Sequence, residues 1–246
     1  MSTVREARRR RLIAARRRRR SVWLHRLVAA AAVVVTIAVL TAGPQRMVGN
    51  TAALVALLSG IPQHGNTLGQ PTAPVTVTEY GDLTCPIGRE FARGSEAQLI
   101  SDVVASGRAK LVYRGFETTS ATANAGEYAG SQIAARAAGL QDRAWYYILL
   151  FYDRQRAETT RYVTDGFMRG IAAAVPGLNL AKWRAARRDA ALAAAVIADG
   201  RAASAAGVTG TPAIFVSGRR GTLQFSDPNT AVPTLPQLQS LITRVS

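Results

Sequence analysis

Residues 75–91 read VTVTEYGDLTCPIGREF. The first half of this stretch alternates in hydrophobicity with period two, so that Val77 and Glu79 share one face of a predicted strand. Pro86 suits the first turn of a helix, where its fixed φ and its missing N–H group cost little. The stretch therefore predicts a strand, a turn, and a helix over about residues 86–106.

Further along the chain, hydrophobic periodicity predicts one more strand, about ninety largely helical residues, and then two short strands and a closing helix. The strands are predicted at 110–116, 213–217 and 222–225, and the helices at 121–140, 144–154, 162–175, 180–188, 190–206 and 235–245. Aromatic residues between 145 and 152 are interpreted as the core of this helical region rather than as a cofactor site. The order βαβ, helical insert, ββα is typical of an α/β protein with a thioredoxin-like fold that is split by a helical subdomain.

Cys85 is the only cysteine in the 246 residues, which excludes an internal disulfide and a disulfide-stapled scaffold. At the start of a helix, its sulfur would face unpaired N–H groups and the positive end of the helix dipole, which favour a thiolate. The alternative is that a lone cysteine acts as a small buried hydrophobe. The strand before it and Pro86 after it favour the reactive thiol.

Two further features could complete a site around this thiol. Glu79 lies six residues before Cys85 on the apolar face of its strand, where a carboxylate is costly without a partner or a role such as proton relay. The alternative is that the strand ends early and leaves Glu79 in water. Thr211-Pro212 precedes a later strand, and only X–Pro bonds readily become cis. A cis bond would turn the Thr211 backbone towards an extended substrate, whereas a trans bond would make Pro212 an ordinary loop residue.

These residues lie in segments that resemble a known family. The stretch 79–91 is similar to the opening of the DsbA-like thioredoxin-fold proteins, in particular the membrane-anchored bacterial ones. The segment GVTGTPAIFV at 207–216 resembles their cis-proline loop and the strand after it, and residues 162–167 and 175–183 resemble their helical insert. The resemblance covers about residues 60–246.

The resemblance implies a role for each candidate residue. Cys85 matches the attacking cysteine, Glu79 the buried carboxylate, and Thr211-Pro212 the cis-proline pair that binds substrate. It implies a thiol–disulfide oxidoreductase that acts on protein thiols or disulfides, with no cofactor. We also predict no metal site, because His25 and His64 have no ligand partners at a useful spacing.

The chain departs from this family inside the active-site motif Cys85-Pro86-Ile87-Gly88. The family has a second, resolving cysteine where this chain has Gly88, so the chain cannot store an internal disulfide. Cys85 could still attack a substrate disulfide, and a thiol from the substrate, a small molecule or a redox partner would then release it. We predict such monothiol exchange, with a catalytically degenerate binding or chaperone module as the alternative.

The N-terminal residues predict a membrane anchor. Residues 1–26 carry eleven arginines and one acidic residue, and residues 27–43 carry no charge. We interpret 1–26 as a cytoplasmic tail and 27–43 as a single transmembrane helix, which leaves the rest of the chain outside the cytoplasm. A cleaved signal peptide is the alternative, although small residues are poorly placed for cleavage. The tail lacks interleaved aromatic residues, so we do not expect nucleic acid as a partner.

The remaining domain boundaries follow from composition. Residues 44–74 are interpreted as a juxtamembrane helix at 51–61 followed by a linker at 62–74, which is rich in glycine, proline and polar residues. Residues 75–246 form the predicted thioredoxin-like domain, with a helical insert at about 121–206.

Overall fold

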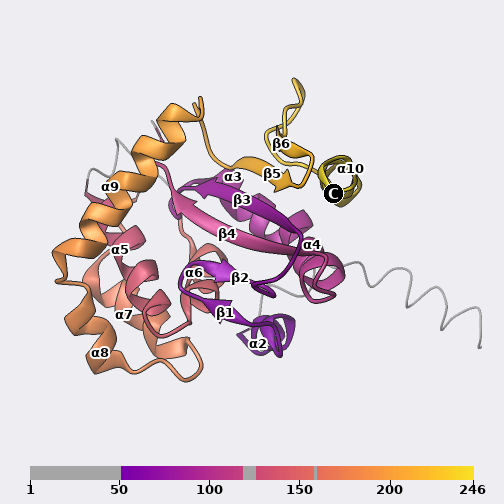
Figure 1. The fold of residues 1–246 in the computed structure, drawn as a ribbon. Helices are drawn as coiled ribbons and strands as arrows, with labels where there is room; N and C mark the ends of the chain where they lie inside the picture. Colours follow the sequence, from indigo (N-terminus) through magenta and orange to yellow (C-terminus); the bar gives the residue numbers. More distant parts are fainter. Residues whose placement is uncertain (1–50, 119–125, 158–159) are drawn as a thin grey trace, which may run out of the picture. The chain divides into compact units, whose positions relative to one another are not determined.

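The computed structural model describes residues 51–118, 126–157 and 160–246, and in them a six-stranded mixed sheet is packed between helices (Figure 1). The strands lie in the order β1-β2-β4-β3-β5-β6. Their bounds are β1 Gln63–His64, β2 Thr67–Leu68, β3 Val75–Gly81, β4 Ala109–Gly115, β5 Ala213–Gly218 and β6 Gly221–Gln224. The predicted thioredoxin-like arrangement with a helical insert is confirmed.

The predicted tail, the predicted transmembrane helix and the start of the predicted juxtamembrane segment lie outside the described residues. Within 51–118, 126–157 and 160–246, none of the helices is both long enough and apolar enough to cross a membrane.

β3 is the central strand and carries the first part of the candidate site. It pairs in parallel with β4 and antiparallel with β5, so that Glu79 lies between Tyr113 and Ile214. Val75, Val77 and Glu79 are completely buried on one face, as the alternating pattern predicts. The alternative in which Glu79 lies in water is therefore wrong.

A long helical segment crosses from β3 to β4. It comprises α3 Pro86–Phe91, the π-helical segments η2 Ala92–Glu96 and η3 Ile100–Val104, and between them α4 Ala97–Leu99. Gly94 interrupts the helical backbone with φ −106° and ψ −109°. The sequence predicts one helix over about residues 86–106, and the structure has a kink within it because glycine tolerates this conformation.

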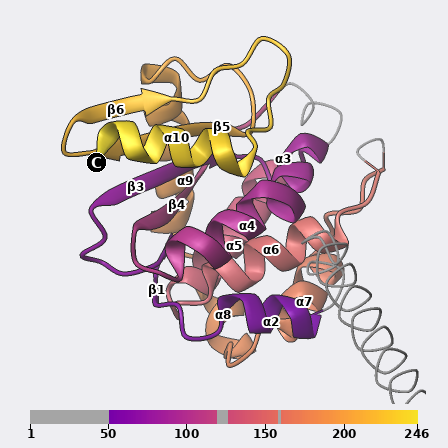
Figure 2. The same ribbon diagram turned by 90° about the vertical axis from the view of Figure 1, so that its right-hand side faces the viewer.

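Helices cover both faces of the sheet. α10 (Leu235–Val245) contributes Leu238 and Ile242 to the main core, which also contains Val77 and Val216. On the other face, Tyr80 packs with residues of α9 (Ala190–Ala205) and of the segment that follows it. Figure 2 shows α10 in front of the strands and α9 behind them.

The predicted linker at 62–74 is wrong in part, because β1 and β2 form a hairpin there that extends the sheet beyond β4. Asn66 holds the hairpin in place with two hydrogen bonds. Its side-chain amide donates to Tyr113 O at 2.6 Å, and its backbone carbonyl accepts from Trp145 Nε1 at 3.0 Å. Strands of two residues have no periodicity that a sequence pattern could reveal. The helix before the hairpin, α2 (Thr51–Leu58), is shorter than predicted.

The insert is helical as predicted. Its remaining helices are α5 Glu127–Gly139, α6 Ala144–Arg154, α7 Asp165–Ala174 and α8 Leu180–Ala186. α7 begins later than predicted because Thr164 is its N-cap and accepts a hydrogen bond from Phe167 N at 3.1 Å. The start predicted for α5 lies partly outside the described residues. Most of the aromatic residues between 145 and 152 are completely buried, as the core interpretation requires.

Candidate active site

Cys85 lies at the N-cap of α3, directly after the turn that leaves β3. Its backbone is extended, with φ −72° and ψ 123°, and Pro86 occupies the first helical position. The Cys85 amide donates to Asp82 O at 3.0 Å, and the Cys85 carbonyl accepts from Arg89 N at 3.2 Å. Only 5% of Cys85 is exposed. The predicted strand–turn–helix thus places the thiol at the start of a helix.

Asp82 shapes this turn, a role that sequence reasoning missed. Its side chain is completely buried. One carboxylate oxygen accepts from Thr84 N at 2.9 Å and from Thr84 Oγ1 at 2.6 Å, and the other accepts from Thr118 Oγ1 at 3.2 Å. An aspartate that bonds the backbone two residues on is the local signature of an Asx turn, so the spacing Asp-Leu-Thr was a usable signal.

The loop before β5 meets the cysteine. The Thr211–Pro212 peptide bond is cis, and Cys85 Sγ donates to Thr211 O at 3.4 Å. Residues 126 positions apart in the chain are therefore neighbours in the site. The structure brings together the cysteine and the proline pair, as predicted. Next to them, Ile87 is 40% exposed and offers an apolar contact at the surface.

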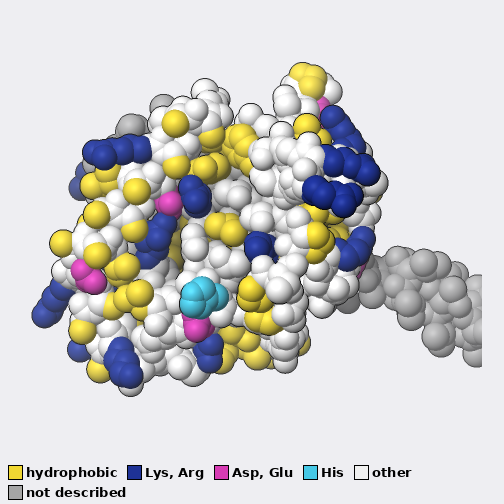
Figure 3. Space-filling model, in the orientation of Figure 1, with side chains coloured by type: hydrophobic (Ala, Val, Ile, Leu, Met, Phe, Trp, Pro, Cys, Tyr) yellow, Lys and Arg dark blue, Asp and Glu magenta, His cyan; other side chains and the backbone are white. Residues whose placement is uncertain are grey.

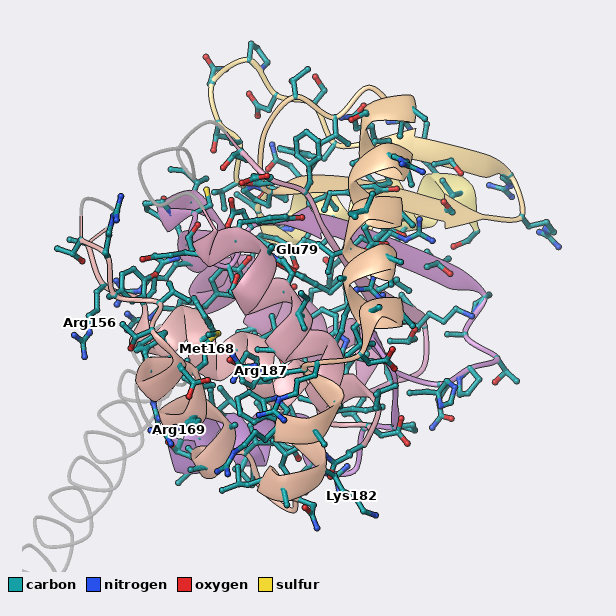
Figure 4. All side chains as sticks on the ribbon, turned by 90° about the vertical axis from the view of Figure 1, so that its left-hand side faces the viewer. Glu79, Arg156, Met168, Arg169, Lys182 and Arg187 are labelled. Carbon is teal, nitrogen blue, oxygen red and sulfur yellow. The ribbon has the colours of Figure 1, made fainter. Side chains whose placement is uncertain are left out.

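Glu79 lies beneath the turn, in the interior of the molecule. Figure 4 shows it beside the strands, whereas Arg156, Arg169 and Lys182 lie at the periphery. Burial raises the pKa of Glu79 to about 7, although hydrogen bonding to Glu96 and Tyr152 counteracts part of the rise. A carboxyl group with this pKa changes its charge near neutral pH, as a proton relay requires.

A second buried carboxyl group, Glu96, lies within hydrogen-bonding reach of Glu79. Burial, and then the neighbouring charge of Glu79, raise the pKa of Glu96 well above its ordinary value. Glu79 Oε2 and both carboxyl oxygens of Glu96 find no N–H or hydroxyl donor among the described residues. A proton held between the two carboxyl groups would satisfy them, as in other buried carboxyl pairs.

Sequence reasoning missed Glu96, but a signal was present. It lies on the same helical face as Ala92, Leu99, Ile100 and Val103, all of which are buried. Burying a carboxyl group on the apolar face of a helix costs free energy, just as it does on the apolar face of a strand.

Gly88 is buried in the first turn of α3, facing Tyr152 on α6. The single hydroxyl proton of Tyr152 has two possible acceptors, Glu79 Oε1 at 3.5 Å and Asp82 O at 3.4 Å from Oη. Tyr152 belongs to the predicted core of the insert, yet it reaches the active-site turn. Its side chain is completely buried, which keeps the hydroxyl inside this polar cluster.

Gln155, one turn further along, holds the insert against the turn. Its side-chain amide donates to Leu83 O at 2.9 Å and to Cys85 O at 3.0 Å. No pattern in the sequence marks this contact, because it joins residues 70 positions apart.

Among the described residues, no group of three or more histidine, cysteine or acidic side chains could hold a metal ion. Figure 3 shows one histidine beside an acidic side chain on the surface. His64 Nδ1 lies 3.6 Å from Asp142 Oδ1, and the two side chains are 92% and 50% exposed. Such an exposed pair contributes little to stability.

Comparison with known proteins places this geometry in a family. A family model described as thioredoxin matches residues 63–231. A curated relative from Bacillus anthracis, the probable disulfide bond formation protein D, is 23% identical over 167 residues, which is 68% of this chain and 76% of the relative. Its Bacillus cereus counterpart is equally similar.

Two solved structures have the same fold. BdbD from Bacillus subtilis, in its oxidised form, matches with a TM-score of 0.62 and 19% identity, over 76% of this chain and 96% of that one. DsbA from Chlamydia trachomatis matches with a TM-score of 0.59 and 16% identity, over 73% and 90%. The chain therefore belongs to the thioredoxin family, and its sequence resembles the DsbA-like members, in which a second active-site cysteine stands where this chain has Gly88.

Proposed function

We propose that this chain catalyses thiol–disulfide exchange on protein thiols outside the cytoplasm, and that it does so through Cys85 alone. The observation that carries the proposal is the Cys85 thiol at the start of α3, 3.4 Å from the Thr211 carbonyl of the cis-proline loop. The name of the curated relatives, which refers to disulfide bond formation, supports an oxidoreductase.

The exchange has two steps. The Cys85 thiolate attacks one sulfur of a substrate disulfide, forms a mixed disulfide, and displaces the other substrate sulfur as a thiolate. A second thiol, from the substrate or from a small molecule, then attacks the mixed disulfide and displaces the Cys85 thiolate. Cys85 ends in its initial oxidation state. The net reaction is a rearrangement or a transfer of disulfides.

The site offers two aids to this exchange. The Thr211 backbone lies beside the thiol and can pair with an extended substrate segment, as in strand addition. The carboxyl pair Glu79–Glu96 can take up or return a proton as the thiol changes charge, because burial places the pKa of Glu79 near neutrality. Glu96 acts through Glu79 and is a positioning residue.

The proposed location follows from the N-terminal sequence. The arginine-rich residues 1–26 would remain in the cytoplasm by the positive-inside rule, and residues 27–43 would span the membrane. The thioredoxin-like domain would then face an oxidising compartment, where substrate disulfides persist.

One observation favours the alternative, a binding module without turnover. Cys85 is almost completely buried, and its S–H group donates to Thr211 O. This hydrogen bond must break before Cys85 can attack a disulfide as a thiolate. A binding module would use the same surface, with Ile87 as an apolar anchor.

The deciding experiment follows the refolding of a protein with scrambled disulfides in a glutathione buffer, with the full chain in detergent. We expect the native chain to accelerate recovery of the native disulfides, and Cys85→Ser to abolish the acceleration. Mass spectrometry should show a mixed disulfide at Cys85 during turnover. If the native chain and Cys85→Ser bind the scrambled protein equally well and neither accelerates its refolding, the proposed enzymatic activity is wrong and the binding module remains.

A further inference from the structure

The space next to Gly88 is filled by the end of α6. A β-carbon built at position 88 would lie 2.9 Å from Tyr152 Oη and 3.1 Å from Tyr152 Cε1. Real β-carbons do not approach other atoms to 2.9 Å, and packed interiors absorb such additions only with movement. A side chain at position 88 and the present Tyr152 ring therefore exclude each other.

Tyr152 is held in this position from two directions. Its hydroxyl oxygen lies 3.5 Å from Glu79 Oε1 and 3.4 Å from Asp82 O, so its single proton is donated to one of these acceptors or shared between them. Three residues later, Gln155 donates to the carbonyls of Leu83 and Cys85 and so fastens the end of α6 to the active-site turn. The ring is completely buried, so it cannot turn out into solvent without opening the core.

We propose that the Tyr152 ring occupies the space that a side chain at position 88 would need, so that the packing of Tyr152 against Gly88, and not only the lack of a second cysteine, excludes an internal resolving thiol here. The inference rests on the proposed monothiol exchange and deepens it. Burial raises the pKa of Tyr152 well above its ordinary value, so its hydroxyl stays protonated. A phenol in this state does not displace a thiolate from a disulfide. Release of a mixed disulfide at Cys85 therefore requires the electron pair of a thiolate from outside the chain.

A stability cycle tests the occupancy of this space without any redox chemistry. Helix propensity alone favours alanine over glycine at position 88. In the native chain, we nevertheless expect Gly88→Ala to raise the equilibrium constant for unfolding about tenfold, because its methyl group meets Tyr152. In a Tyr152→Leu chain, the same substitution should leave this constant unchanged or lower it.

Tyr152→Phe provides a second background in case Tyr152→Leu does not fold. It removes only the hydroxyl, which is the atom nearest to a β-carbon at position 88. In this background Gly88→Ala should therefore destabilise the chain less than it does in the native chain, or not at all. Equal effects of Gly88→Ala in the native chain and in the variant backgrounds, within about twofold, would overturn the proposal.

A second measurement concerns release of the mixed disulfide. Cys85 is loaded with glutathione by glutathione disulfide, and release of one glutathione by the thiol introduced in Gly88→Cys is timed after excess reagent is removed. We expect release at least about tenfold faster in Gly88→Cys with Tyr152→Leu than in Gly88→Cys alone. Equally fast release in both would contradict the proposal. If Cys85 of the native chain does not react with glutathione disulfide at all, the proposed exchange fails, and the stability cycle still decides the role of Tyr152.

Discussion

Two sets of buried acidic groups lie beside the central strands, and they are satisfied in different ways. Asp199 on α9 accepts hydrogen bonds from the Arg136 guanidinium of α5 and, at 3.2 Å, from Gly115 N at the end of β4. Glu79 and Glu96 are buried more deeply and have no cation beside them among the described residues. The first acid has a countercharge, whereas burial raises the pKa values of both members of the second pair, which favours a proton shared between them.

The difference separates a structural role from a chemical one. The ion pair of Arg136 and Asp199, together with the Gly115 donor, joins α5, α9 and β4. A carboxyl pair that depends on a proton changes its charge when the proton moves, so it responds to pH. The burial of an acid alone would not have distinguished these two cases.

The largest expected effect is the loss of stability when Asp199 loses its ion-pair partner. Arg136→Leu leaves Asp199 buried without its countercharge, and we expect the free energy of unfolding to fall by about 3 kcal/mol. Urea denaturation measures this loss. Arg136→Lys keeps a positive charge and should lose clearly less. A loss below about 1 kcal/mol for Arg136→Leu would show that Asp199 does not depend on the pair.

The carboxyl pair should give stability a distinct pH dependence. Its members bind protons more strongly in the folded chain, because burial raises the pKa of Glu79 from 4.5 to about 7. Their contribution is complete below pH 4.5 and is lost as pH rises through 7, since the folded state then loses a proton that the unfolded state has already released. We expect a fall on the order of 2 kcal/mol between pH 5 and pH 8.

Urea denaturation across this pH range checks the prediction. The pKa values of Asp165 and Asp227 are lowered, first by hydrogen bonds from Arg187 and from Asn229 respectively, so their contributions are lost in more acidic solution and do not interfere. Glu79→Gln should flatten the profile. A stability that rises with pH over this range would contradict a protonated pair.

The two acidic sites should also differ in their effect on catalysis. We expect Glu79→Gln to slow disulfide exchange about tenfold, because the amide cannot take up a proton, and to change the pH dependence of the rate. Asp199→Asn, measured at an equal folded fraction, should change the rate by less than about twofold. A comparable loss in both variants would show that the effect is not specific to Glu79, and it would contradict the role in proton transfer.

Sequence patterns predicted the parts of the fold and of the site that depend on neighbours along the chain. β3, the helix start at Pro86 and the depth of Glu79 follow from alternation and from local backbone rules. The proline pair of the later loop was found because X–Pro is a special bond, and the family resemblance supported it. These features lie in short segments whose geometry the backbone itself restricts.

Apart from the Asx turn at Asp82, which has a local signature, the contacts that were missed depend on packing between distant segments. Glu96 meets Glu79 only because the kinked helix lies across β3, and Tyr152 reaches Gly88 only because α6 ends against the active-site turn. The hairpin around Asn66 has strands of two residues, and hydrogen bonds to Tyr113 and Trp145 hold it in place. No local propensity encodes such contacts, which tertiary structure decides.

The smallest expected effect completes the comparison, because it removes an acid that has no countercharge. Glu96→Leu replaces a buried, proton-sharing carboxyl group by an apolar side chain of similar size. No cation is left unpaired among the described residues, and Glu79 can remain protonated, so we expect the free energy of unfolding at pH 6 to change by less than about 1 kcal/mol. Glu96→Gln, which keeps a polar partner for Glu79, serves as the matched control. A loss above about 2 kcal/mol for Glu96→Leu would show that Glu96 is ionised and bonded in the folded chain, and the contrast with Arg136–Asp199 would fail.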